Sequence, residues 1–143
     1  NEFGIVSTLR SLCSELGSLA GFDAVFENSG SLDRMSKKSQ VYLYRIAQEA
    51  LNNIAKHARA TQVTMKLNRI DNIVCLEVSD NGKGFIFDPV SFAQRNGLQN
   101  MRERTQLLQG EFIMNSKPGN GTTIKVSIPY NTGNGKDQTD FGG

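Results

Sequence analysis

Four short polar segments carry the residues of this 143-residue chain that could do chemistry. In chain order they are EALNNIAKH (residues 49–57), DNGKGF (80–85), NGLQNMRER (96–104) and GNGTT (119–123). The first places an acid and amides on one helix, and the others contain glycines, at which a backbone can approach a ligand closely. Four segments of different chemistry in this order indicate a chain that folds around a nucleotide.

The first segment combines an acid with an amide at helical spacing. Glu49 and Asn53 are four residues apart, so both side chains leave the same helix face, and Lys56 and His57 follow one turn later. Mg²⁺ prefers oxygen ligands and retains waters, so one amide oxygen together with phosphates can hold it. A nearby carboxylate can orient or deprotonate a nucleophile. A plain solvated face is the alternative, but two amides in mid-helix are unfavourable and argue for a site.

A single histidine near a helix end is typical of capping or packing. We therefore expect His57 to have a phosphate-side or structural role, and nucleophilic chemistry is the less favoured interpretation.

The second segment begins with an acid at the end of an apolar strand. The carboxylate of Asp80 could accept a hydrogen bond from the exocyclic amine of adenine, while Gly82 and Gly84 let the backbone turn beneath the base. An ordinary Asn-Gly hairpin turn is the alternative. The segment is neither a dinucleotide-binding loop, because the third glycine is missing, nor a Walker A loop, because no Gly-Lys-Ser/Thr follows.

The last two segments are less specific when each is taken alone. Gly97 precedes a predicted helix, and a helix N-terminus after a glycine can bind phosphate, although an ordinary helix start is equally compatible. The segment 119–123 could be a simple hairpin turn. The hydroxyl of Thr122 matters only if this turn lies near the other three segments.

Hydrophobic periodicity predicts the elements that position these segments. Helices are predicted over residues 3–19, 36–58 and 98–109, and strands over 23–27, 63–67, 73–78, 111–115 and 122–129. This order predicts an α/β two-layer sandwich, in which three helices cover one face of a mixed, mostly antiparallel sheet of about five strands. Residues 1–130 form one domain, and the polar tail 131–143 has too little to bury and is predicted to be disordered.

Composition excludes several classes of function. A formal net charge of +2 and the absence of a Lys/Arg run argue against nucleic-acid binding. No apolar run approaches the roughly 20 residues that cross a bilayer, so we expect no membrane contact by this chain and place it in the cytoplasm, whether or not a longer parent is membrane-anchored. Cys13 and Cys75 are far apart in the sequence and have no other metal-binding residues near them, which indicates two free thiols in a reducing compartment. A disulfide between them is the less favoured alternative.

With these segments assembled, the chain resembles the ATP-binding domain of a bacterial sensor histidine kinase of the nitrate/nitrite-sensor subgroup. LYRIAQEALNNIAKHARA (residues 43–60) resembles the N box, DNGKGF the G1 box, GLQNMRER (97–104) the G2 box and GNGTT the G3 box. The resemblance covers residues 3–129. It implies the Bergerat fold of the GHKL superfamily, which also includes gyrase, heat-shock chaperone and mismatch-repair ATPases.

The resemblance implies roles for the N-box residues. Asn53 would be the Mg²⁺ ligand, and Glu49 would polarise the attacking group or a metal-bound water. Lys56 and His57 would line the phosphate or ribose side of bound ATP. Glu49 and Lys56 are accordingly the predicted catalytic residues.

The resemblance also implies roles for the glycine-bearing segments. Asp80 would hydrogen-bond the adenine amine, with Thr122 supporting the adenine site, often through water. The G1 glycines would shape the pocket floor, and a mobile lid over the phosphates would span residues 87–96 and continue into the G2 box. The further ATP-binding residues assigned in this way are Gly82, Gly84, Gly97 and Leu98.

Two departures from the family pattern concern function directly. Arg95 stands where the family usually has the first glycine of a G-x-G, and it could itself meet phosphate. The phosphoacceptor histidine of the family lies in a dimerising helical hairpin before residue 1, so His57 is not the acceptor. The implied partners are those acceptor helices and a downstream response regulator. The isolated domain is expected to be monomeric and its parent homodimeric.

Other functions remain compatible with the same segments. A different GHKL ATPase, such as an anti-sigma-factor serine kinase or an ATP hydrolase, would carry similar boxes. A degenerate module could bind ATP and only regulate a partner, although intact Glu49, Asn53 and Asp80 argue against it. An interaction domain that binds no nucleotide is disfavoured by four boxes in order.

Overall fold

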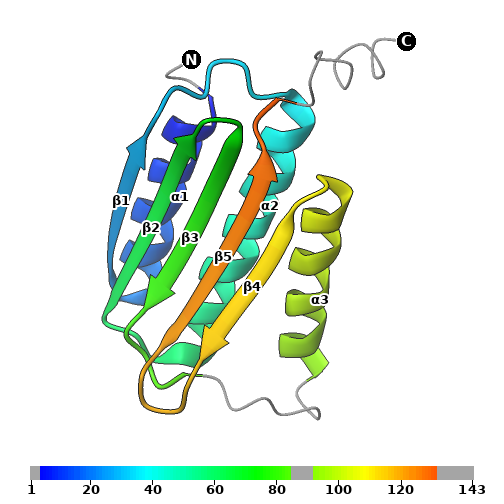
Figure 1. The fold of residues 1–143 in the computed structure, drawn as a ribbon. Helices are drawn as coiled ribbons and strands as arrows, with labels where there is room; N and C mark the ends of the chain where they lie inside the picture. The colour runs from blue at the N-terminus through cyan, green and yellow to red at the C-terminus, as the bar shows by residue number, and fades with distance from the viewer. Residues whose placement is uncertain (1–3, 85–91, 132–143) are drawn as a thin grey trace.

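The chain forms one five-stranded sheet with three helices packed on a single face (Figure 1). The computed structural model describes residues 4–84 and 92–131, with only the backbone of 92–95. The sheet order is β1-β2-β3-β5-β4, in which β1 runs parallel to β2 and the other pairs are antiparallel. The strands are β1 (Asp23–Ser29), β2 (Gln62–Ile70), β3 (Ile73–Asp80), β4 (Glu111–Ser116) and β5 (Thr122–Pro129). The predicted two-layer sandwich is therefore confirmed.

The helices are α1 (Ile5–Ala20), α2 (Lys37–Asn53) and α3 (Phe92–Leu107), with a π-helical turn η1 (Ile54–Ala58) continuing α2. Local sequence explains two of their boundaries. Gly21 ends α1 in the left-handed conformation, at φ 86°. Ser36 caps α2, and its hydroxyl accepts a hydrogen bond of 3.1 Å from the backbone N–H of Ser39.

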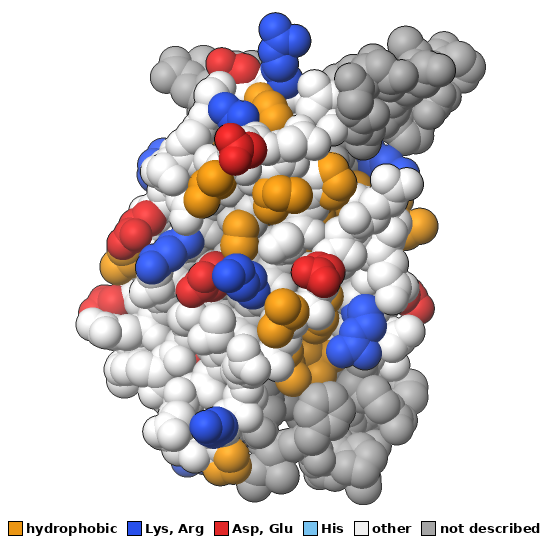
Figure 2. Space-filling view, viewed as in Figure 1, with side chains coloured by type: hydrophobic (Ala, Val, Ile, Leu, Met, Phe, Trp, Pro, Cys, Tyr) orange, Lys and Arg blue, Asp and Glu red, His pale blue; other side chains and the backbone are white. Residues whose placement is uncertain are grey.

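Alternating residues of the central strands divide the sheet into a buried and an open face. Side chains facing the helices are almost fully buried, and those of β2, β3 and β5 are Val63, Met65, Leu67, Val74, Leu76, Val78, Ile124, Val126 and Ile128. Strand register aligns a row of alternating charges on the open face: Glu27, Lys66, Glu77 and Lys125. Figure 2 shows acidic and basic side chains interleaved on this face. Opposite charges on neighbouring strands favour this register.

The two cysteines lie on opposite faces of the sheet. Cys13 lies on the buried side of α1, where its thiol is 3.8 Å from the sulfur of Met65. Cys75 is half-buried on β3, opposite Asn68 and Ser127 in the register of the open face. Both are free thiols as predicted, and the sheet between them rules out a disulfide.

The main difference from the predicted elements is the start of α3. The sequence predicts a helix from residue 98, whereas α3 begins at Phe92 and runs through Gly97. Of the predicted lid, residues 87–91 lie outside the described part of the chain and the remainder is helical. The predicted disordered tail also falls outside it, except for Asn131.

Within the described ranges, none of the helices combines the length and the apolar character that a bilayer span requires.

Truncating a buried side chain should lower the free energy of unfolding far more than truncating an exposed one. Leu43 of α2 is fully buried, so Leu43→Ala should lower the free energy of unfolding by about 2–5 kcal/mol through lost burial and a new cavity. Leu19 of α1 is 84% exposed, and Leu19→Ala should change that free energy by no more than about 0.5 kcal/mol. Urea denaturation of the two variants measures both. Equal losses would contradict the assignment of this core.

Candidate functional site

The N-box, G1 and G3 segments meet at one end of the molecule, the lower end in Figure 1. The backbone N–H of Lys83 in the G1 segment donates a 2.8 Å hydrogen bond to the carbonyl of Ala58, the last residue of η1. The carbonyl of Lys83 accepts a 2.6 Å hydrogen bond from the N–H of Gly119 in the β4–β5 turn. The G1 segment is thus held on both sides by segments that are distant in sequence.

Glycines make this close approach possible. Gly84 has φ +75°, and a Cβ there would overlap the carbonyl oxygen of Lys117. Gly121 has φ +76°, and a Cβ there would overlap the carbonyl oxygen of Asp80. Gly82 packs in the same way against the carbonyl of Ala58. Larger residues would separate the G1 segment from both neighbours.

Asp80 presents one half of its carboxylate without a partner. The residue is 8% exposed, and its Oδ1 accepts a 2.7 Å hydrogen bond from the N–H of Gly82. Its Oδ2 is buried and has no hydrogen-bond partner among the described residues. Burial raises the pKa of Asp80, while the backbone N–H groups of Gly82 and Thr122 oppose that shift. An unpaired buried acceptor costs about 1–3 kcal/mol, so a ligand N–H donor would be stabilised here.

Thr122 lies directly opposite Asp80 in the pairing of β3 with β5 and is buried. Its hydroxyl forms a 2.8 Å hydrogen bond with the hydroxyl of Ser116, the last residue of β4. Sequence reasoning missed Ser116 as a neighbour of this site. The hairpin register across the β4–β5 turn was the available signal, because it pairs Ser116 with Thr122.

The N-box acid and amide also lie together. Asn53 is 5% exposed, and its Nδ2 is buried with no hydrogen-bond partner in the described parts of the chain. A Cβ at Gly97 would lie 2.9 Å from Oε2 of Glu49 and 3.2 Å from Nδ2 of Asn53. The missing side chain at Gly97 therefore lets α3 pass directly over the polar face of α2.

The helix start predicted after Gly97 is wrong, and contact of Gly97 and Leu98 with a nucleotide stays a prediction. Gly97 lies within α3, where its N–H is part of the helix rather than at a free N-terminus. Leu98, predicted to be part of a mobile lid, is 7% exposed and belongs to the hydrophobic core. Gly97 allows α3 to lie close to α2, and Leu98 contributes to the hydrophobic core.

Lys56 and His57 lie in η1, the π-helical turn at the end of the N-box helix. Lys56 is exposed and His57 is half-buried. Single π-helical turns are frequently found at functional sites. The widened turn alters the helical spacing used to predict that both residues share the face of Glu49 and Asn53.

Asn81 is a second residue that sequence reasoning missed. Its side-chain oxygen accepts hydrogen bonds of 2.9 Å from the N–H groups of Thr61 and Gln62. The Asn-Gly pair suggested only a turn, so the sequence carried no signal for partners this far along the chain.

No cluster of three or more His, Cys, Asp or Glu side chains suited to a metal ion occurs in residues 4–84 and 92–131. A Mg²⁺ ion bound with a nucleotide does not require one, since phosphates and waters supply most of its ligands. The buried carboxamide of Asn53, beside the Glu49 carboxylate, is an oxygen-bearing donor set of the kind a hard cation uses.

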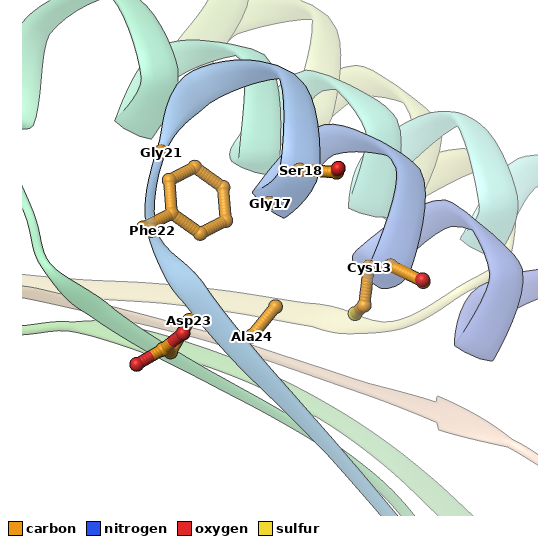
Figure 3. A pocket seen from close by; sticks show the side chains of 8 residues that line it. Cys13, Gly17, Ser18, Gly21, Phe22, Asp23 and Ala24 are labelled. Atoms are coloured by element: carbon orange, nitrogen blue, oxygen red, sulfur yellow. The ribbon is translucent and has the colours of Figure 1, made fainter.

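A separate hollow of about 440 Å³ lies between the end of α1 and the start of β1 (Figure 3). Cys13, Gly17, Phe22 and Asp23 are among its lining residues. Burial raises the pKa of the Cys13 thiol to about 11, so the thiol is protonated at neutral pH and is a poor nucleophile. This hollow is remote in sequence from all four polar segments.

The fold and the meeting of these boxes define a nucleotide-binding two-layer sandwich of the Bergerat type. Residues 38–132 match the family described as histidine kinase-, DNA gyrase B- and HSP90-like ATPase, and the chain belongs to that family. The family binds ATP. The recognised resemblance to a histidine kinase ATP-binding domain is thereby confirmed at the family level, while the nitrate/nitrite-sensor subgroup stays a prediction.

Curated relatives carry the names of signal-transduction and sensor proteins. The chain is 33% identical over 133 residues to the signal transduction histidine-protein kinase/phosphatase DegS of Brevibacillus brevis, covering 92% of this chain and 34% of DegS. It is 40% identical over 98 residues to the sensor protein VraS of Staphylococcus aureus, covering 68% of this chain and 28% of VraS. The chain therefore spans about a third or less of the length of these relatives.

Solved structures share the fold. The blue-light activated histidine kinase of Erythrobacter litoralis superposes with a TM-score of 0.75 at 19% identity, over 89% of this chain and 42% of that chain. The histidine kinase domain of that protein gives a TM-score of 0.71 at 18% identity, over 96% of this chain and 64% of that chain.

The buried charge of Asp80 should reduce stability at neutral pH. Because the pKa of Asp80 is raised in the folded state, its contribution to stability is present below the ordinary value of 3.8 and is lost as the pH rises through the folded-state pKa. Asp80→Asn should therefore have a higher free energy of unfolding than the wild type at pH 7, and the difference should shrink toward pH 4. Urea denaturation across this range measures it, with exposed Asp23→Asn as the control. A difference that grows toward low pH would contradict the burial argument.

Proposed function

We propose that this chain is the ATP-binding domain of a sensor histidine kinase. It binds ATP with Mg²⁺ between the N-box helix and the glycine-bearing segments and supplies the γ-phosphoryl group to a histidine on a separate dimerisation domain. The observation that carries this proposal is the unpaired Oδ2 of Asp80. It is buried where the G1 and G3 segments meet, in a chain of the family whose relatives are named sensor kinases.

Asp80 recognises the base in this proposal. Its free Oδ2 accepts a hydrogen bond from the adenine amine, which replaces the partner that the folded chain does not supply. Gly82 holds the other carboxylate oxygen, and so orients the acceptor. Gly84 and the β4–β5 turn form the floor on which the base rests, with Thr122 and Ser116 behind the carboxylate.

Asn53 and Glu49 act on the phosphate side. Asn53 holds Mg²⁺ through its carboxamide oxygen, and the ion supplies neutralisation of the phosphate charge when bound. Glu49 orients the attacking group and accepts its proton, a role that its half-buried carboxylate beside Asn53 suits. Lys56, His57 and Gly97 border the phosphates. Catalysis by this domain is then mostly positioning of reactants, as phosphoryl transfer generally requires.

The partners follow from the same proposal. The acceptor histidine lies on dimerisation helices of the parent kinase, and the phosphoryl group then passes to a response regulator. This domain acts in the cytoplasm, as a monomeric unit of a homodimeric parent. One alternative is another ATPase of the family, either a hydrolase that turns over ATP by itself or a kinase that phosphorylates a serine. The other is a module that binds ATP without transfer.

Phosphoryl transfer distinguishes these functions directly. The chain should bind labelled ATP yet turn it over very slowly alone, and it should label a histidine when the dimerisation helices of its parent are added. The label is located by mass spectrometry, and acid lability separates phosphohistidine from phosphoserine. Rapid turnover of ATP without the helices would indicate a hydrolase. Binding without any transfer would indicate a regulatory module.

Asn53 should matter for the metal rather than for the base. Asn53→Asp preserves size but adds a second carboxylate beside Glu49, which alters the charge of the ion site. The Mg²⁺-dependent part of ATP affinity should fall by about tenfold, equivalent to about 1.4 kcal/mol, with metal-free affinity much less affected. Calorimetric titration of ATP with Mg²⁺ and with EDTA measures both, and Asn52→Asp on the adjacent residue is the matched control. Equal effects in the two buffers would remove the metal role.

A further inference from the structure

Asn81 makes more hydrogen bonds than a turn residue needs. Its Oδ1 accepts bonds of 2.9 Å from the N–H groups of both Thr61 and Gln62, and its Nδ2 donates a 2.8 Å bond to the hydroxyl of Thr61. Its backbone N–H also donates to the carbonyl of Gln62, at 3.2 Å. All of these partners lie 19 or 20 residues earlier in the chain.

Asn81 lies between the two residues that orient the candidate base-binding carboxylate. The ladder between β2 and β3 ends at the pair Val63–Asp80, so Asn81 is the first residue beyond the sheet. It stands between Asp80 and Gly82, the two residues joined by the bond that orients the carboxylate. Beyond the pair Val63–Asp80 the β2–β3 ladder ends, and the side chain of Asn81 provides further hydrogen bonds to the residues at the start of β2.

An ordinary turn would look different. Asn residues in turns bond mainly to their own backbone within two or three residues, which shapes the turn locally. Asn81 instead bonds to the connection that leads from η1 to β2. These hydrogen bonds are therefore tertiary contacts. They join the residues that follow the N-box helix to the segment that carries Asp80.

We propose that Asn81 is a positioning residue that holds the carboxylate of Asp80 in place for recognition of the adenine amine. This inference rests on the proposed function. Without the three side-chain hydrogen bonds of Asn81, the segment after Asp80 keeps its backbone contacts. It becomes more mobile, however, and no longer fixes the carboxylate of Asp80. Recognition of the base then weakens more than binding of the phosphates, because the phosphate side is formed by α2.

Comparison of two nucleotides isolates this effect. Inosine diphosphate lacks the exocyclic amine of adenosine diphosphate, so the ratio of the two dissociation constants reports recognition by Asp80 and cancels phosphate effects. In Asn81→Ala the preference for the adenine nucleotide should fall by about 5- to 20-fold, the range expected for loss of an oriented hydrogen bond. General loss of stability would weaken both nucleotides alike and leave the ratio unchanged.

The chain offers a matched control at the opposite end of β3. Asn72 is also exposed, and its side chain forms two 3.0 Å bonds with the backbone of Asn131. Asn72→Ala should leave the ratio unchanged. Asn81→Asp retains an acceptor for the N–H groups of Thr61 and Gln62 and should recover most of the preference.

A double-mutant cycle provides the second measurement. Once Asp80→Ala has removed the acceptor, Asn81→Ala should cause little further loss of preference, because both residues act through one hydrogen bond. Additive losses would overturn the positioning role. If Asn81→Ala does not fold, Thr61→Val removes one of the three bonds and should lower the ratio by a smaller factor; an unchanged ratio would then overturn it.

The outcomes also separate this inference from the proposed function. A wild-type chain that binds both nucleotides equally would contradict recognition of adenine by Asp80. A wild type that prefers the adenine nucleotide, with an Asn81→Ala variant that retains the full preference, would contradict only the role of Asn81.

Discussion

The site depends on the attachment of the G1 segment between two distant parts of the chain. The N–H of Lys83 donates to the carbonyl of Ala58 at the end of the N-box helix, and the carbonyl of Lys83 accepts from the N–H of Gly119 in the β4–β5 turn. Because Asp80 lies three residues before this anchor, its carboxylate is fixed relative to both neighbours. Glycines at 82, 84 and 121 are needed since any side chain there would meet a backbone carbonyl. The polar segments therefore act as one unit only in the folded chain.

The same arrangement leaves two buried polar atoms unsatisfied, Oδ2 of Asp80 and Nδ2 of Asn53, among the residues described. Such groups reduce the stability of the folded state, and they are commonly found where a ligand supplies the missing partner. The core compensates for them through fully buried apolar side chains on α2 and the central strands. The apolar and polar side chains of α2 thus lie on different faces of the same helix, since Leu43 and Leu51 pack inward while Glu49 faces α3.

Much of the fold could be predicted because its signals are local. Alternation along the strands and the apolar stripe of α2 follow from burial of one face. Ser36 is of a residue type that favours helix N-caps, and its hydroxyl accepts the capping bond from Ser39 in the structure. The start of α3 could not be predicted in this way. A glycine normally favours a helix end, but at Gly97 its lack of a side chain allows contact with Glu49.

The sequence by itself determined which chemical groups this protein carries, their order, and the two-layer architecture, because residue types, spacing and hydrophobic periodicity are properties of neighbouring residues. Only the tertiary structure decided that Gly97 lies inside a helix and that Asn81 holds the start of β2. Those contacts join residues far apart in the chain or depend on what packs opposite them. Their geometry arises when the sheet and helices assemble, and no local pattern encodes it.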